Sequence, residues 1–314
     1  MRPHSSASES RRQALIILGM HRSGTSALAG ALGIFGARLP MQSALPVLKR
    51  LRQAIKTLRR RERENPKGYF EPEEIVRIHD RLLRAAGTSW SGYERVSHEW
   101  LRSAEARGFV EELVDAVRQD YADAPLFVVK DPRMCRIMPL WRIVLDRIAV
   151  NPGYAIPVRR PLEVARSLER RDPNKFTPAH GCRMWLRHVL DAERETRGSP
   201  RVFVHYHELL KNPAQIAEHV IVQLAGEKPA FNKESAEHLD SFIDPQLQHH
   251  SAESEEPQPP MAFHPWLLDA YDALSALVLR PNDEAAQRRL DGVSSLFDAS
   301  MPAVFDAGRV PRSR

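Results

Sequence analysis

Four short apolar runs divide the chain at long intervals. Each run is rich in Val, Ile, Leu or Phe, and none alternates between apolar and polar positions, which is typical of strands buried on both faces of a parallel sheet. The runs are residues 14–18, 125–130, 154–158 and 201–206. We therefore expect these runs to be the strands of one central parallel sheet.

Stretches with helical periodicity lie between the apolar runs. They include an Ala/Leu-rich stretch after the first run and residues 75–87, 109–121 and 161–171. Strands that alternate with helices predict an α/β fold, here a three-layer domain with a parallel sheet between helices. The long intervals between strands leave room for the helices that such crossovers require.

Composition shifts suggest where this domain begins and ends. Residues 1–12 are polar, and we expect a disordered N-terminus there. Residues 251–260 (SAESEEPQPP) are poor in apolar side chains and read as a linker. We therefore assign residues 13–250 to the α/β domain and residues 251–314 to the linker and a helical C-terminal extension, with helical patterns at 266–279 and 284–297.

Overall composition narrows the class of protein. The chain has 314 residues, 42% of them hydrophobic and 27% charged, which is ordinary for a soluble domain. A net charge of +6 favours anionic ligands, but an aromatic fraction of 7% offers no stacking platform for nucleic acid. Cys135 and Cys182 form no metal-binding or disulfide pattern. No apolar stretch approaches the length of a membrane span, so we expect a cytoplasmic protein; its oligomeric state is left open.

The segment after the first apolar run, residues 17–32 (ILGMHRSGTSALAGAL), has the layout of a phosphate-binding loop. Gly19 and Gly24 permit a tight turn, and the amides of residues 22–26 can point at a phosphate at the start of the next helix. Thr25 and Ser26 add hydroxyl donors. Thr25 stands where a Walker A loop has lysine, and Arg22 brings positive charge from another direction.

Two further strands of the predicted sheet end in basic residues. The second run leads into Lys130 and the sequence KDPR, and the third leads into Arg159 and the sequence RRP. Ligands bind at the carboxyl ends of parallel strands, so these segments and the glycine loop predict one anion site. A lysine that ends an apolar strand has no role in the core, which makes Lys130 a candidate functional residue.

The loop GMHRSGTSALAGAL resembles the 5′-phosphosulfate loop of the sulfotransferases that use 3′-phosphoadenosine 5′-phosphosulfate (PAPS), with Arg22 in place of the lysine of the cytosolic branch. VRRPLEVARSL resembles the 3′-phosphate motif of that family, which implies Arg159 and Ser167 as its phosphate-binding residues. Ser167 lies about two turns into a helix that Pro161 can start, so a strand-end guanidinium and this hydroxyl can converge on one phosphate. Residues 206–213 (YHELLKNP) resemble a later element of the family.

The resemblance, closest to the bacterial and glycan-type branch, implies PAPS as co-substrate, with no metal. Its binding residues are carried over as Arg22, Ser23, Gly24, Thr25, Ser26, Arg159 and Ser167. The implied reaction is in-line transfer of the sulfuryl group to a hydroxyl of a carbohydrate or small-molecule acceptor.

The resemblance also implies three catalytic residues. Residues 65–75 (NPKGYFEPEEI) are similar to the segment that carries the catalytic glutamate, which makes Glu71 the candidate base. The same letters are typical of a helix start, with Pro72 in the first turn, so both interpretations of Glu71 stay open. Lys130 and Arg22 are the cations expected to stabilise the departing phosphate. Asp131 and Arg133 are expected to support the site.

Two other functions remain possible at this stage. An ATP-dependent small-molecule kinase needs a Walker lysine, which is absent, and a strand-end carboxylate, for which Asp131 is the only convenient candidate. An inactive nucleotide-binding homologue fits if neither Glu71 nor a histidine such as His21 faces the sulfur.

Three features outside these motifs receive simpler interpretations. His205 and His207 share one face of the predicted fourth strand but lack a third ligand, so we expect no metal site. Residues 49–67 form a basic helical pattern, which is either a solvated face or a wall of the acceptor cleft. Trp90 and Trp185 are expected in the core.

Overall fold

The computed structural model describes residues 12–40, 70–226, 239 and 264–306. Its sheet has four strands, β1 (Gln13–Ile17), β2 (Leu126–Lys130), β3 (Asn151–Val158) and β4 (Arg201–His205), in the order β2-β1-β3-β4. Every neighbouring pair is parallel, and the register sets Ile17 beside both Lys130 and Ala155. The four apolar runs are thus the four strands, and the predicted α/β fold with a parallel sheet is confirmed.

Helices fill the intervals between the strands and continue after β4. They are α1 (Thr25–Ile34), α3 (Glu73–Ala85), α4 (His98–Leu101), α5 (Ala104–Tyr121), the 3-10 helix η1 (Pro132–Arg136), α6 (Met138–Arg147), α7 (Pro161–Arg171), α8 (Pro178–Glu195), α9 (Tyr206–Lys211), α10 (Pro213–Ala225), α12 (His264–Leu279) and α13 (Glu284–Asp306). The helices expected at 75–87 and 161–171 are present as α3 and α7, and α5 begins five residues before the expected 109 because Ser103 caps it.

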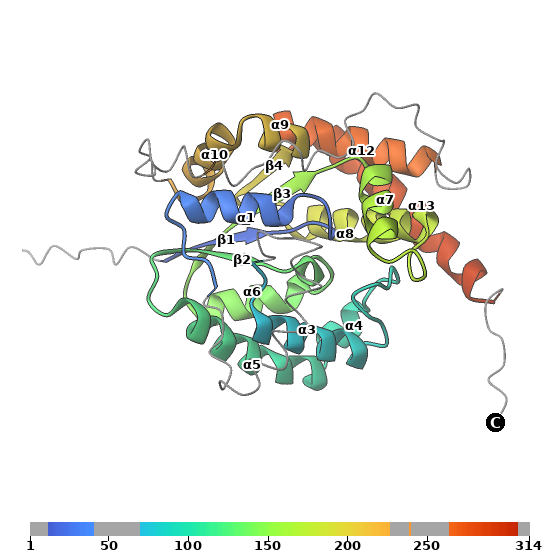
Figure 1. Cartoon of the computed structure of the whole chain (residues 1–314). Helices are drawn as coiled ribbons and strands as arrows, with labels where there is room; N and C mark the ends of the chain where they lie inside the picture. The colour runs from blue at the N-terminus through green and yellow to red at the C-terminus, as the bar shows by residue number, and fades with distance from the viewer. Residues whose placement is uncertain (1–11, 41–69, 227–238, 240–263, 307–314) are drawn as a thin grey trace, which may run out of the picture.

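The sheet separates two layers of helices. Helices α1 and α10 pack in the core on one face of the sheet, and α3, α5 and α6 pack in the core on the other; in Figure 1 the latter three lie below the strands. Strand β1 shows why its sequence does not alternate: Leu15 and Ile17 belong to the core on the α1 and α10 side, whereas Ala14 and Ile16 belong to the core on the other side. Both faces of the strand are therefore buried, and apolar side chains are needed at every position.

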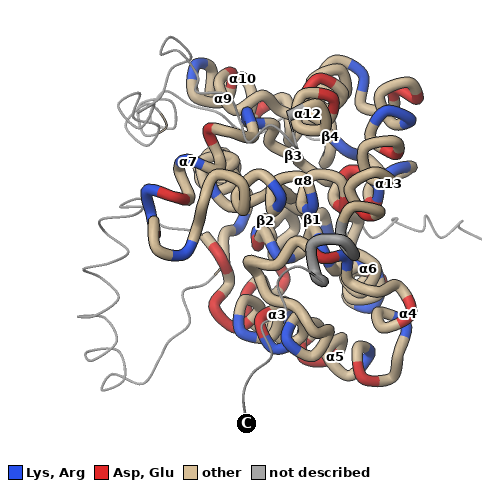
Figure 2. Tube along the Cα trace, turned by 90° about the vertical axis from the view of Figure 1, so that its right-hand side faces the viewer, with Lys and Arg blue, Asp and Glu red and all other residues tan. Residues whose placement is uncertain are grey.

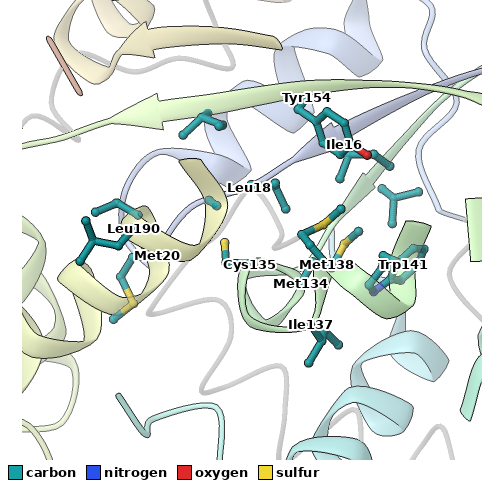
Figure 3. Close-up of a cluster of buried hydrophobic side chains, with 14 of the residues drawn as sticks. Ile16, Leu18, Met20, Met134, Cys135, Ile137, Met138, Trp141, Tyr154 and Leu190 are labelled. Atoms are coloured by element: carbon teal, nitrogen blue, oxygen red, sulfur yellow. The ribbon is translucent and has the colours of Figure 1, made fainter. Parts of the chain in front are cut away.

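The larger core lies on the side of α6 and α8. Figure 3 shows its centre, where Ile16 and Leu18 from the first strand meet Met134, Cys135 and Trp141 from the segment that follows β2. These residues are fully buried. This packing holds the segment after β2 against the start of the glycine loop. The end of β2, which carries Lys130, is thereby held beside the same loop.

The C-terminal helices pack on the same core. Leu267 and Leu274 of α12 and Leu290 and Phe297 of α13 are buried in it. Arg187 of α8 forms an ion pair with Asp298 of α13, and Arg197, just past the end of α8, pairs with Asp291 of α13 at 2.9 Å. The extension is thus helical and packed on the main domain as expected, while the boundary at residue 250 lies outside the described residues and stays a prediction.

Other expectations also fall outside the described part of the chain. These are residues 1–11 of the disordered N-terminus expected at 1–12, the basic helix at 49–67 and the linker at 251–260. Within the described ranges, Lys and Arg are interspersed with Asp and Glu over α3, α5 and α13, so these outer helices present no surface of a single sign (Figure 2). No helix in those ranges combines the length and apolar character needed to cross a membrane.

Two tryptophans expected in the core differ in burial. Trp185 is 1% exposed, as expected, whereas Trp90 is partly exposed and packs against the edge of the core. Trp90 lies in the connection between α3 and α4, which runs beside the glycine loop: its ring centroid is 5.0 Å from that of His21. Trp90 is therefore a neighbour of the candidate site.

Candidate functional site

The glycine loop joins β1 to α1 through two residues with left-handed backbone conformations. Gly24 has φ 95° and Arg22 has φ 70°, which is uncommon for a residue with a side chain. The amide of Ser23 donates to the carbonyl of Met20 at 3.1 Å, and the amide of Gly19 donates to Sγ of Cys135 at 3.1 Å. The loop is thus a tight turn held from within and from the segment after β2.

Helix α1 begins in a way that suits an anion. Its N-cap is Gly24, and no side chain caps it, whereas Ser103 and Thr177 accept hydrogen bonds from the first turns of α5 and α8. The first N–H groups of any α-helix lack intrahelical acceptors, and the helix dipole favours negative charge there. The hydroxyl of Ser23 beside this turn is buried and has no hydrogen-bond partner among the described residues. These donors fit a phosphate group.

The glycine loop is hydrogen-bonded directly to α7 and to Arg159 in the connection between β3 and α7. The Nε atom of Arg22 donates to Oγ of Ser167 at 2.9 Å. In return, Nη1 of Arg159 donates to the carbonyl oxygen of Arg22 at 2.8 Å, and its Nε donates to Glu163 at 3.0 Å. The two segments singled out as phosphate motifs in the sequence therefore form one cluster with two guanidinium groups.

Lys130 lies at the end of β2 with its side chain 2% exposed. Its Nζ atom is 2.6 Å from Oε1 of Glu71 and donates to Oγ of Ser26 at 3.3 Å. Ser26 lies in the first turn of α1, so the ammonium group joins the sheet, the glycine loop helix and the segment before α3. A strand-end lysine, a carboxylate and the helix start that no side chain caps are thus brought together.

The position of Glu71 bears on its two interpretations, a candidate base or part of a helix start. Helix α3 begins at Glu73, with Pro72 as its N-cap, and the acidic residues of its first turn are Glu73 and Glu74. Glu71 lies before the helix and turns its carboxylate to Lys130. Its side chain is 18% exposed, so a solvent-borne hydroxyl group can reach it. The location of Glu71 favours a role at the site over a role in starting the helix.

Asp131 is the centre of a buried polar cluster behind Lys130. Its Oδ1 accepts from the amide and Nη1 of Arg133, at 3.0 and 2.9 Å, and its Oδ2 lies 2.7 Å from Nδ1 of His79. Burial by itself raises the pKa of Asp131, but Arg133 and His79 outweigh it and hold that pKa well below its usual range. Both oxygens are occupied, and Asp131 supports the site structurally.

The same cluster defines the proton position on His79. Nε1 of Trp141 can only donate, and it lies 2.9 Å from Nε2 of His79. Nε2 must therefore accept, which places the imidazole proton on Nδ1, where it is donated to Asp131. Arg133 is also paired with Asp80 at 2.7 Å. Its guanidinium is therefore held between two carboxylates of the protein, Asp131 and Asp80.

His21, within the glycine loop, packs against the ring of Trp90. Burial chiefly, and then Arg133, hold the pKa of His21 well below its usual range, so the imidazole is neutral. Its Nε2 atom is buried and has no partner among the described residues. The ring of His188 lies 6.4 Å away, and burial followed by Arg136 lowers the pKa of His188 to about 3. Two neutral histidines thus adjoin the loop.

The connection that carries Trp90 is held by buried donors that sequence patterns did not reveal. Five of its carbonyl groups accept side-chain hydrogen bonds: Ser89, Gly92 and Glu94 from Arg136, Ser91 from His180, and Tyr93 from Arg187. Arg136 and Arg187 are 3% and 0% exposed, although arginine at such positions reads as surface in the sequence. Their donors satisfy a backbone that forms neither helix nor strand.

The expected arrangement of His205 and His207 is wrong. His205 ends β4, but His207 lies in helix α9, because the chain turns at Tyr206 and the strand ends earlier than the apolar run. The two rings remain 5.0 Å apart. Within the ranges that the structure describes, no group of three or more His, Cys, Asp or Glu side chains is arranged to hold a metal ion.

Comparisons with known proteins find similarity to solved structures alone. No protein-family model and no curated protein matches the chain. Among solved structures, the chain is similar to the sulfotransferase domain from the Synechococcus PCC 7002 olefin synthase, with 17% sequence identity over 80% of this chain and 87% of that one and a TM-score of 0.39. Structural similarity at this TM-score and identity carries no weight for function. The geometry described above is therefore the basis of the function proposed below.

Proposed function

We propose that this protein is a sulfotransferase that moves the sulfuryl group of PAPS to a hydroxyl group of a carbohydrate or small-molecule acceptor. The observation that carries the proposal is the pair of hydrogen bonds that Arg22 makes, one to Ser167 in the middle of α7 and one from Arg159 just before α7. A nucleotide with phosphates at both the 5′ and 3′ positions needs two anion sites held at a set separation. The joined loops supply them.

The residues present fit such a nucleotide. The open start of α1 and the hydroxyls of Ser23, Thr25 and Ser26 would hold the 5′-phosphosulfate. Arg159 and Ser167 would hold the 3′-phosphate, and Arg22 adjoins both groups. A nucleoside 5′-phosphate held in this way has no need of the Walker lysine that Thr25 replaces. The unpartnered Ser23 hydroxyl supports this assignment, because buried polar groups are normally hydrogen-bonded.

Glu71 and Lys130 would carry the chemistry. Glu71 takes the proton of the acceptor hydroxyl as the hydroxyl oxygen forms a bond to sulfur and the bond from sulfur to the bridging phosphate oxygen breaks. Lys130 stabilises the negative charge that builds on that oxygen, from the side of Ser26. For this to happen the ammonium must shift from Glu71 towards the phosphate, which leaves the carboxylate free to accept a proton.

The kinase alternative is weakened by Asp131. A kinase of this fold would use a strand-end carboxylate to bind magnesium. Asp131 is fully buried, and its two oxygens are engaged by Arg133 and His79. The inactive homologue is disfavoured by Lys130 and Glu71, which lie together at the start of α1.

Nucleotide binding tests the proposal without knowledge of the acceptor. Isothermal titration with 3′-phosphoadenosine 5′-phosphate (PAP), 5′-AMP and magnesium-ATP should rank PAP first. We expect PAP to bind at least tenfold more tightly than 5′-AMP, about 1.4 kcal/mol, because only PAP engages Arg159 and Ser167. A matching rise in melting temperature should accompany PAP binding. Equal affinity for PAP and 5′-AMP, or a preference for magnesium-ATP, would refute the sulfotransferase assignment.

A further inference from the structure

The ring of Tyr206 rests on the backbone of the glycine loop. Tyr206 is the first residue of α9, directly after β4. A Cβ atom added to Gly24 would lie 2.4 Å from Cδ2 and 2.9 Å from Cε2 of this ring, which is closer than such atoms can approach. Glycine is therefore required at position 24 for two reasons: its φ is 95°, and the Tyr206 ring leaves no room for a side chain.

The same ring supports Arg159. The Cζ atom of Arg159 lies 4.1 Å from the centroid of the Tyr206 ring, within the range of a cation–π contact. The guanidinium also donates to Glu163 and to the carbonyl oxygen of Arg22. Three contacts thus define its plane: an aromatic ring, a carboxylate and the backbone of the loop.

Tyr206 itself is held firmly. Leu209 and Leu210 of α9 are buried in the core that also contains Leu28 and Leu32 of α1. This packing attaches the short helix to the layer that begins with the glycine loop. The core therefore sets the position of the ring relative to Gly24. Because Arg159 lies on this ring, the core also determines where its guanidinium is held.

We infer that Tyr206 is a positioning residue that couples the two phosphate-binding segments, an inference that rests on the proposed function for its ligand. The ring presses on Gly24, where the 5′ side would bind, and supports Arg159, where the 3′-phosphate would bind. Arg159 has many side-chain rotamers, so an aromatic platform lowers the entropy lost when its guanidinium is fixed. Tyr206 acts through the face of its ring, and its phenolic oxygen is not needed.

Affinity measurements on two variants test this role. Tyr206→Phe keeps the ring, and its preference for PAP over 5′-AMP should stay within about twofold of the original protein. Tyr206→Leu removes the ring and should lower that preference by about threefold to tenfold, in the range of a cation–π contact. Tyr93→Leu is a matched control, because that ring also faces an arginine, Arg183 at 5.5 Å, but lies outside the phosphate cluster; its preference should not change.

A second mutation tests whether Tyr206 works through Arg159. In an Arg159→Ala background, Tyr206→Leu should change the PAP preference by less than about twofold, because the supported guanidinium is gone. An equal loss in both backgrounds would overturn the inference. So would a loss in Tyr206→Phe as large as in Tyr206→Leu, since the hydroxyl group would then be the contact that matters.

Hydrogen exchange of the nucleotide-free protein gives a test that does not depend on the proposed function. Loss of the ring in Tyr206→Leu should speed amide exchange in residues 20–26, while Tyr206→Phe should leave it unchanged. If the original protein does not prefer PAP over 5′-AMP, the proposed function fails. Amide hydrogen exchange then remains the test of the contact between Tyr206 and the glycine loop. If the preference exists and neither it nor the exchange responds to Tyr206→Leu, the inference about Tyr206 fails.

Discussion

Lys130 and Glu71 form an ion pair in which Nζ and Oε1 lie 2.6 Å apart, with the hydroxyl of Ser26 within 3.3 Å of the same ammonium group. The pair joins residues that are 59 positions apart, and it lies at the start of α1. In the nucleotide-free protein each group satisfies the other. An anion bound at the helix start would compete for the ammonium, so in the proposed reaction binding of the donor would release Glu71 from Lys130.

Glu71→Gln should separate binding from chemistry. The substitution keeps the shape of the side chain but removes its ability to take a proton, so turnover with PAPS and an accepted alcohol should fall about a hundredfold or more. PAP affinity should hold or rise, because Lys130 loses its competing partner. Glu74→Gln, which changes an exposed carboxylate of α3 paired with Arg77, should leave both quantities unchanged. Turnover of Glu71→Gln within a few-fold of the original protein would assign the base to another residue, with His21 next in line.

Loss of Arg22 should mainly weaken nucleotide binding, whereas loss of Lys130 should mainly lower kcat. The sequence alone led us to expect a transition-state role for Arg22, but its Nε donates to Ser167 in the 3′-phosphate motif. We therefore expect Arg22→Ala to weaken PAP binding about tenfold, with a smaller change in kcat. Arg22→Lys should restore part of the affinity, since a charge remains without the fork geometry.

Lys130→Met should show the opposite pattern. The side chain keeps most of its volume in a buried position, but the cation that faces the departing oxygen is lost. We expect kcat to fall by more than about a hundredfold and PAP affinity by less, as measured in a sulfate-transfer assay with separate titrations. If Arg22→Ala instead reduces kcat more than it reduces affinity, Arg22 shares the transition-state charge, as its place in the loop first indicated.

Asp131 should contribute more to stability than Asp80, the other carboxylate that pairs with Arg133. Asp131→Asn leaves Arg133 without its buried counter-charge, and loss of one member of a buried pair costs about 3 kcal/mol or more of unfolding free energy. Asp80→Asn removes the second partner of Arg133, which is 38% exposed, and should cost less than about 1 kcal/mol. Urea unfolding of both variants at neutral pH measures the difference. Equal losses would mean that the buried cluster does not stabilise the fold as its geometry implies.

The two neutral histidines beside the loop should make the protein sensitive to mild acid. Burial and nearby arginines lower the pKa of His188 to about 3 and that of His21 well below its usual range. The unfolded chain takes up protons near pH 6.5, whereas the folded chain does not, so stability is lost as pH falls from about 6.5 towards about 3. Each group contributes up to about 1.4 kcal/mol per pH unit in this window.

Replacement of one histidine isolates its share of this effect. Urea unfolding between pH 7 and pH 5 should show a smaller loss of stability with falling pH in His188→Gln than in the original protein. The quantity compared is the pH slope, so a general destabilisation by the substitution does not disturb the result. An unchanged slope would show that His188 takes up its proton equally in the folded and unfolded chains.

Much of the fold could be predicted from local sequence. The four apolar runs are strands because every position of a strand buried on both faces must be apolar, a requirement visible in β1 at Ala14 to Ile17. The glycine loop was also recognisable, since Gly24 adopts a conformation that few other residues tolerate. The helix start at Pro161 followed from the fixed φ of proline. Each of these signals acts within a few residues of the structure it specifies.

The contacts that define the site needed the tertiary structure. Arg22 and Ser167 are 145 positions apart, and nothing near either residue in the sequence indicates that one donates to the other. Arg136 and Arg187 read as surface residues, yet both are buried, because carbonyl groups from a distant connection accept their hydrogen bonds. The segment around Glu71 allowed two interpretations, a candidate base or a helix start. The pairing of Glu71 with Lys130, which only the tertiary structure shows, favours the first. A charged side chain can be buried only where a partner compensates for its lost hydration, and the fold alone decides which partner is near.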